Sequence, residues 1–113
     1  MTIGDVYWVA MPARGGHAQA GRRPAIIFQT AAVSSKILTV LIVPLTSQQD
    51  ALRFPGTVLV EPDKTNGLRQ ISVALVFQLT AVDRNLILGQ LGRITPALLT
   101  QIRASLDEIT GRP

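Results

Sequence analysis

KILTVLIVPLT, residues 36–46, contains the longest apolar run of the chain and limits the kind of fold that the chain can form. Its valines, isoleucines and leucines follow one another with few polar interruptions, as in a strand that is covered on both faces. The run is far shorter than the roughly 20 residues needed to cross a bilayer. We therefore expect residues 36–46 to form a buried strand inside a soluble domain.

Other strand-like segments lie on both sides of this run. Pro, Asp, Asn and Gly within EPDKTNG (61–67) predict a turn between two of them. Two glycines in LILGQLGRI (86–94) predict bends or bulges in that strand. The predicted strands are GDVYWVAM (4–11), PAIIFQT (24–30), GTVLVEP (56–62), SVALVFQLTAV (72–82) and LILGQLGRI (86–94).

The final segment has the pattern of an amphipathic helix. Thr95 can cap it and Pro96 occupies the favoured first position. Gly111 suits its C-terminal end. The apolar residues recur at helical spacing: Leu98, Leu99, Ile102, Leu106 and Ile109. The pattern as a whole predicts a small, mainly β, antiparallel barrel closed by one C-terminal helix.

The composition limits size, partners and chemistry. A chain of 113 residues fits one domain, 1–113. Because 47% of its residues are hydrophobic and only 16% are charged, we expect part of its surface to meet a second subunit in a homodimer. The net charge is +4, and nine of the eleven cations are arginine, which suits phosphate oxygens although a GC-rich genome has the same effect.

Several classes of site are excluded by composition. The chain has no cysteine and one histidine, so we expect no disulfide, no thiolate nucleophile, no multi-histidine metal centre and no cofactor. The segment MTIGDVYWVAMP has neither the basic leader nor the long apolar stretch of a signal peptide. We therefore expect a cytoplasmic protein without a membrane segment.

The stretch GGHAQAGRRP (15–24) concentrates unusual residues in one loop. It holds the only histidine, His17, together with Arg22 and Arg23. The proline that follows Arg23 restricts that arginine to extended conformations, while the glycines let the loop bend behind it. Loops on a rigid barrel commonly carry binding and catalytic residues.

GDVYWV, GHAQAGRRPAII, VPLTS and QLTAVD, in this order and followed by a C-terminal helix, resemble the MazF/PemK (Kid-type) toxin family. The QAGRRP–VPLTS pair is the most specific part of this resemblance. It implies an SH3-like barrel, a homodimer, an antitoxin partner that covers the RNA groove, and metal-independent, sequence-specific cleavage of single-stranded RNA. It also implies that Arg23 and Thr46 form the central catalytic pair, with His17 as a third catalytic residue.

These residue types suit cleavage by the 2′-hydroxyl, which leaves a 2′,3′-cyclic phosphate and a 5′-hydroxyl. Arg23 would stabilise the charge on the phosphate, Thr46 would orient it, and His17 would transfer a proton near neutral pH. Further RNA contacts are expected from the 12–23 loop and from residues 47–55. The candidates for RNA binding are Arg14, Gln19, Arg22, Ser47, Gln48 and Arg53.

Three positions depart from the family pattern. Ala18 stands at a glutamate position, and alignment on Gln78 places Leu75 and Phe77 where Kid-type members carry Arg and Asp. Either the proton transfer depends on His17, or catalysis is slow, or RNA is bound with little cutting. The alternatives are a weakened or inactive toxin relative, a CcdB-like gyrase inhibitor on the same fold, and an SH3-like module for proline-rich peptides. The last is disfavoured by the few aromatic residues.

Overall fold

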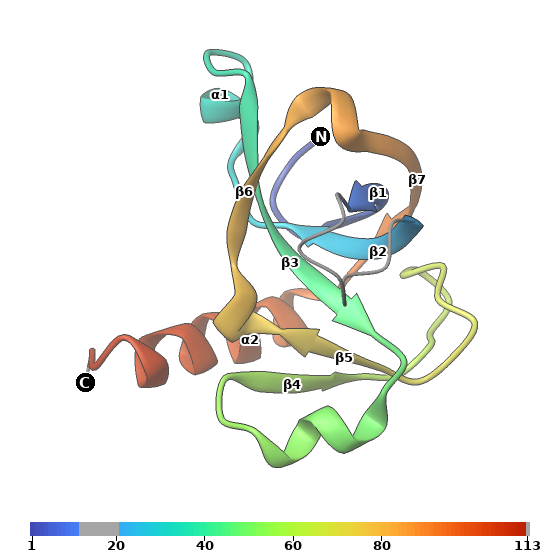
Figure 1. Cartoon of the computed structure of the whole chain (residues 1–113), viewed down its shortest axis with the longest axis vertical. Helices are drawn as coiled ribbons and strands as arrows, with labels where there is room; N and C mark the ends of the chain where they lie inside the picture. Colours follow the sequence, from blue (N-terminus) through green and yellow to red (C-terminus); the bar gives the residue numbers. More distant parts are fainter. Residues whose placement is uncertain (12–20, 113) are drawn as a thin grey trace.

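The computed structural model describes residues 1–11 and 21–112, and it is built around one curved antiparallel sheet with a helix at its C-terminal end (Figure 1). The strands are β1 (Asp5–Met11), β2 (Gly21–Ile27), β3 (Thr39–Thr46), β4 (Thr57–Val60), β5 (Ser72–Leu75), β6 (Thr80–Asp83) and β7 (Ile87–Arg93). The helices are α1 (Ala31–Ser34) and α2 (Pro96–Ile109), with short 3-10 turns η2 (Gln49–Arg53), η3 (Val76–Gln78) and η4 (Arg84–Leu86).

The strand order confirms the predicted mainly β fold class with a C-terminal helix. The strands follow one another in the order β4-β5-β3-β2-β1-β7, with β6 paired to β3, and every pairing is antiparallel. Within the described residues the sheet is not closed by strand pairing, since β4 and β7 end the path. The predicted barrel is therefore an open, curled sheet, and α2 packs against β4 and η3.

The core is divided into two apolar clusters, because successive side chains of a strand point to opposite faces. One contains Val6, Ile26, Val43 and Leu45 and extends to Ile102 of α2. The other contains the alternate residues of the same strands: Val9, Ala25, Ile27, Val40 and Ile42. β3 is thus covered on both faces, as its apolar run predicts.

The prediction of one strand over SVALVFQLTAV (72–82) is wrong. β5 pairs with the end of β3, whereas β6 pairs with its beginning, and η3 lies between them. The chain has to turn a corner at η3 in order to follow the curvature of β3. Apolar sequence alone does not reveal such a corner, because both short strands and the turn hold apolar residues.

The ends of several elements differ from the predicted ones. β2 begins at Gly21, before the expected start at Pro24, and β3 begins at Thr39, after Lys36. The predicted helix is confirmed, with the Thr95 side chain accepting a hydrogen bond from the Leu98 amide. The predicted irregularity of residues 86–94 is also confirmed, because the β1–β7 register shifts twice. Among the described residues, none of the helices has the length and apolar content required to cross a membrane.

Candidate functional site

The site arises where β2 and β3 separate. Ala25 pairs with Pro44, but beyond this pair β3 changes partner, and Leu45 and Thr46 pair with β5 instead. Pro24 and Pro44 lie at this point, and neither has an amide hydrogen to extend the ladder. The GRRP and VPLT motifs therefore place their residues on two strands that move apart.

A pocket of about 530 Å³ opens between these strand ends and the loop before β5. It brings together five of the residues predicted from the sequence: Arg22, Arg23, Thr46, Ser47 and Gln48. Arg53 does not line this pocket, and its guanidinium instead lies 4.8 Å from the centre of the Phe54 ring. The predicted residues His17, Arg14 and Gln19 lie outside the described residues.

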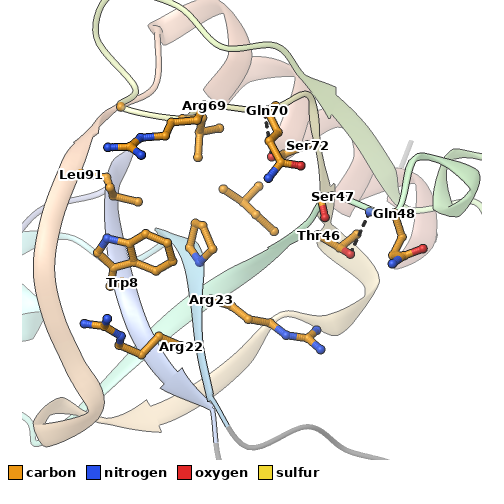
Figure 2. A pocket seen from close by; sticks show the side chains of 14 residues that line it. Trp8, Arg22, Arg23, Thr46, Ser47, Gln48, Arg69, Gln70, Ser72 and Leu91 are labelled. Atoms are coloured by element: carbon orange, nitrogen blue, oxygen red, sulfur yellow. Dashed lines mark hydrogen bonds between the residues drawn. The ribbon is translucent and has the colours of Figure 1, made fainter.

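Arg23 and Thr46 lie on the same face of the sheet. Each is two residues beyond the Ala25–Pro44 pair, and side chains two residues apart in a strand point the same way. In Figure 2 the Arg23 side chain extends toward the side of the pocket where Thr46 and Gln48 lie. The half-buried Thr46 hydroxyl accepts a hydrogen bond of 3.2 Å from the Gln48 amide, so its own hydrogen remains able to donate to a bound oxygen.

Arg22 points the opposite way from Arg23, toward Trp8 (Figure 2). Its guanidinium carbon lies 5.8 Å from the centre of the Trp8 ring, within the range of a cation–π contact. Trp8 is half-buried and is paired with Pro24 across the strands. The two neighbouring arginines thus serve two different parts of the pocket.

Sequence reasoning missed the third wall of the pocket, which is the loop between β4 and β5. Arg69, Gln70 and Ser72 line the pocket from this loop and the start of β5. The signal in the sequence is LRQ (68–70), directly after EPDKTNG (61–67). The turn residues of EPDKTNG predict only a turn and do not indicate that the residues after it line a pocket. In Figure 2, Arg69 and Gln70 lie across the pocket from β2.

Hydrogen bonds within the loop hold this wall in place. The fully buried Asn66 donates to the Glu61 carbonyl at 2.9 Å and accepts from the Leu68 amide at 3.0 Å. Asp63 accepts from the amides of Thr65 and Asn66, each at 2.8 Å, and these bonds lower the pKa of its carboxyl below the ordinary 3.8. These hydrogen bonds give the loop a defined conformation, in which Arg69 and Gln70 line the pocket.

The pocket is positively charged. Three arginines line it, and none of the described lining residues is acidic. Hydroxyl and amide groups from Thr46, Ser47, Gln48 and Gln70 complete the polar surface. Within residues 1–11 and 21–112, no group of three or more His, Asp or Glu side chains lies together as metal ligands would. The described part of the site offers donors for an anion with phosphate geometry.

Comparison with known proteins shows the family and the fold to which the chain is similar. The "Endoribonuclease MazF" of Staphylococcus saprophyticus is 26% identical over 107 residues, which cover 95% of this chain and 88% of that protein. MazF from Deinococcus radiodurans (Form-I) is 26% identical, with a TM-score of 0.78 over 98% of this chain and 96% of the other. A MazE–MazF structure (Form-II) from the same organism is 24% identical, with a TM-score of 0.77 over 100% and 97%. The family model described as PemK-like, MazF-like toxin of type II toxin–antitoxin system matches residues 2–110, and the chain belongs to this family.

Proposed function

We propose that this protein is a toxin that cleaves single-stranded RNA at specific short sequences without a metal ion. The observation that carries the proposal is the shared pocket of Arg23 and Thr46, at the point where β2 and β3 separate. A relative with 26% identity is named an endoribonuclease, which supports the same activity here. We place its action in the cytoplasm, where RNA is available, as expected for a toxin of this family.

The reaction uses the 2′-hydroxyl of the RNA as the nucleophile. Its oxygen attacks the adjacent phosphorus, the bond to the 5′-oxygen breaks, and the products are a 2′,3′-cyclic phosphate and a 5′-hydroxyl. Arg23 carries a permanent charge and can hold two phosphate oxygens, whose negative charge increases in the transition state. Thr46 donates one further hydrogen bond that orients the phosphate.

Proton transfer in this scheme depends on His17. Phe77, at the position where Kid-type members carry Asp, is half-exposed and lines a different hollow with Phe54, Pro55 and Ile109. Phe77 has no carboxylate and does not line the pocket of Arg23, so this position contributes no proton-transfer group. A histidine has an ordinary pKa of about 6.5, so it can accept the proton of the 2′-hydroxyl or donate one to the leaving oxygen near neutral pH.

A direct cleavage assay tests the proposal. Purified protein is incubated with a long, weakly structured RNA and a chelator, and the new ends are mapped and chemically identified. Discrete cuts with cyclic phosphate and 5′-hydroxyl ends are expected. Intact RNA would overturn the proposal, and inhibition of a topoisomerase by the same preparation would favour a CcdB-like gyrase inhibitor. Slow cutting would indicate a weakened relative.

The proposed protein partner is a cognate antitoxin with an acidic segment. Its carboxylates would compete with phosphate for the arginines of the pocket, Arg22, Arg23 and Arg69. One of the similar solved structures is a MazE–MazF assembly, which supports a partner of this kind. Addition of the antitoxin is expected to stop cleavage and to compete with RNA for binding.

The proposed quaternary state is a homodimer formed through a second, apolar hollow. It is lined by Phe54, Pro55, Phe77 and Ile109, none of which is charged. Such a surface fits a second copy of itself better than it fits an acidic partner. Light scattering is expected to give twice the chain mass of 12.2 kDa for the parent protein. The Phe77→Glu variant is expected to have the mass of a monomer. A parent protein of 12.2 kDa would contradict this.

A further inference from the structure

The part of the pocket around Trp8 has no role in the proposed reaction, which uses Arg23 and Thr46. Trp8 is the only tryptophan of the chain and one of five aromatic residues, so its position in a polar, basic pocket is notable. Its ring is half-buried rather than enclosed in the core. A large flat apolar surface at a polar site is the feature on which unpaired nucleic-acid bases stack.

We propose that the Trp8 side of the pocket binds one unpaired base of the RNA, next to the phosphate that Arg23 holds. This inference rests on the proposed function and names a subsite within it. Leu68 and Leu91 provide further apolar walls, and Pro24 lies beside the tryptophan on the neighbouring strand. These residues enclose a surface suited to a flat ring.

Successive side chains of β2 point to opposite faces of the sheet, and this separates the base from the phosphate. The Arg22 side chain lies on the same side of the strand as Trp8, whereas Arg23 lies on the side of Thr46 (Figure 2). The Arg22 side chain is exposed, so a base that stacks on Trp8 can displace it toward the phosphate of its own nucleotide. The base and the reacting phosphate are then held on opposite sides of one strand end.

Gln70 is the residue placed to read the identity of the base. Its side-chain amide offers both a donor and an acceptor, as the edge of a base does, and it lines the pocket from the opposite wall. Arg69 lies beside it and adds donors for base oxygens or for phosphate. The loop that carries both is fixed by the buried Asn66. Gln70 is therefore expected to influence sequence preference more than the rate of cleavage.

Fluorescence of the single tryptophan tests the subsite directly. The probes are two short RNAs with 2′-O-methyl riboses, which cannot attack their own phosphates, one with bases and one abasic. Stacking is expected to quench Trp8 with the first RNA and not with the second. Equal quenching by both RNAs would overturn the subsite. Quenching by a short acidic peptide but not by RNA would also overturn it, because a peptide side chain would then occupy the position.

Variants provide a second and independent measurement. In anisotropy titrations with a labelled 2′-O-methyl RNA, Trp8→Leu is expected to weaken binding about fivefold to 100-fold, and Trp8→Phe is expected to restore most of the affinity. Tyr7→Leu is the matched control, since Tyr7 is on the same strand but points to the other face. Unchanged affinity in Trp8→Leu would overturn the subsite alone if the parent cleaves RNA. A parent that neither binds nor cleaves RNA would instead overturn the proposed function.

Discussion

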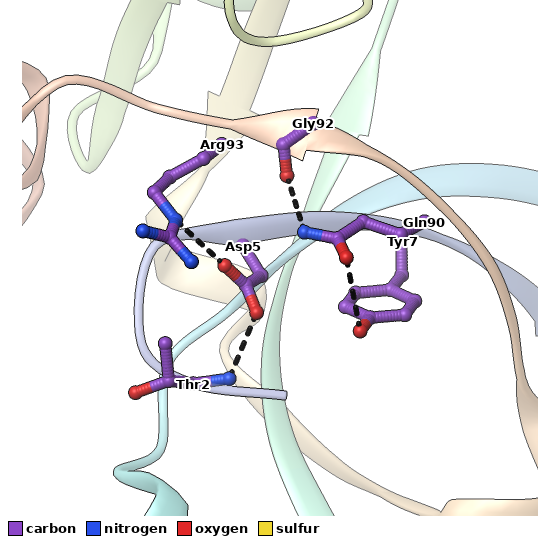
Figure 3. A network of polar contacts seen from close by, with 6 residues as sticks. All are labelled: Thr2, Asp5, Tyr7, Gln90, Gly92 and Arg93. Carbon is purple, nitrogen blue, oxygen red and sulfur yellow. Dashed lines mark hydrogen bonds and ion pairs between the residues drawn. The ribbon is translucent and has the colours of Figure 1, made fainter.

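Arg93 on β7 donates a hydrogen bond from Nε to Oδ1 of Asp5 on β1, with 3.0 Å between the two atoms (Figure 3). The other carboxylate oxygen accepts from the Thr2 amide at 2.9 Å. The Asp5 side chain is only 4% exposed, whereas that of Arg93 is 63% exposed. These contacts fix the start of β1, three residues before Trp8. The acidic residue of GDVYWV thus holds the edge of the sheet and lies outside the pocket.

Asp5→Ala is expected to lower the free energy of unfolding by about 1–2 kcal/mol. The variant loses two hydrogen bonds, while the exposed guanidinium of Arg93 can turn to water. Urea denaturation measures the change. Cleavage by the folded variant is expected to match the parent, and a loss of activity at unchanged stability would contradict a purely structural role for Asp5.

Arg23→Ala is expected to reduce RNA cleavage by about 100-fold or more, because an arginine that stabilises transition-state charge contributes on this scale. Its stability is expected to change little, since the half-buried side chain belongs to neither apolar cluster. The measurement is the single-turnover rate on one cleavage site. Arg103→Ala is the matched control, because Arg103 lies on α2 against Phe28, away from the pocket. A variant as fast as the parent would refute the site.

The fold was predictable from sequence where apolar patterns coincide with strand pairing. Residues 36–46 show where the pattern stops being sufficient: Ile37 and Leu38 belong to the apolar run, yet Leu38 is 78% exposed. β3 begins only at Thr39, where its partner β6 becomes available through Asp83. Strand ends are set by the neighbouring strand, and a single sequence does not contain that information locally.

The site was predictable where a motif carried it. GRRP and VPLTS indicate Arg23 and Thr46 through the resemblance to the MazF/PemK family, and the structure places both in one pocket, where the pairing of β2 with β3 ends. Arg69 and Gln70 were missed because they reach the pocket only through the folding of the 61–71 loop. The side-chain hydrogen bonds of Asn66 that determine this folding do not produce a periodic pattern.

His17→Ala is expected to slow cleavage and to remove one limb of the pH–rate profile, because a histidine, whose ordinary pKa is about 6.5, is then missing from the reaction. The profile of kcat/KM is measured between pH 5 and pH 9 with the parent and the variant side by side. His17→Gln, which keeps hydrogen bonding without titration near neutral pH, is the companion variant. An identical profile in all three proteins would show that His17 does not transfer the proton.

Asp63 is expected to make the stability of the pocket loop dependent on pH. Its pKa is lowered in the folded protein, so the carboxylate contributes stability above the ordinary value of 3.8, and this contribution is lost as the pH falls from there through the lower folded value. The difference in melting temperature between parent and Asp63→Ala should be constant near neutral pH and should shrink toward pH 3. Asp63→Asn, which keeps an acceptor oxygen without charge, should vary less with pH. A difference that grows in acid would contradict the assignment.

Gly67→Ala is expected to disturb the loop and the pocket together. Gly67 has a φ of +71°, and an added Cβ would collide with the carbonyl oxygen of Leu91 on β7. A left-handed conformation alone costs a non-glycine residue about 1–2 kcal/mol, and the collision adds to this. Because Arg69 and Gln70 follow on the same loop, RNA affinity should fall along with the melting temperature. Gly89→Ala is the matched control on β7, since an added Cβ there meets no atom within 4 Å. Loss of stability in Gly67→Ala with full RNA affinity would show that the loop does not position the two side chains for RNA.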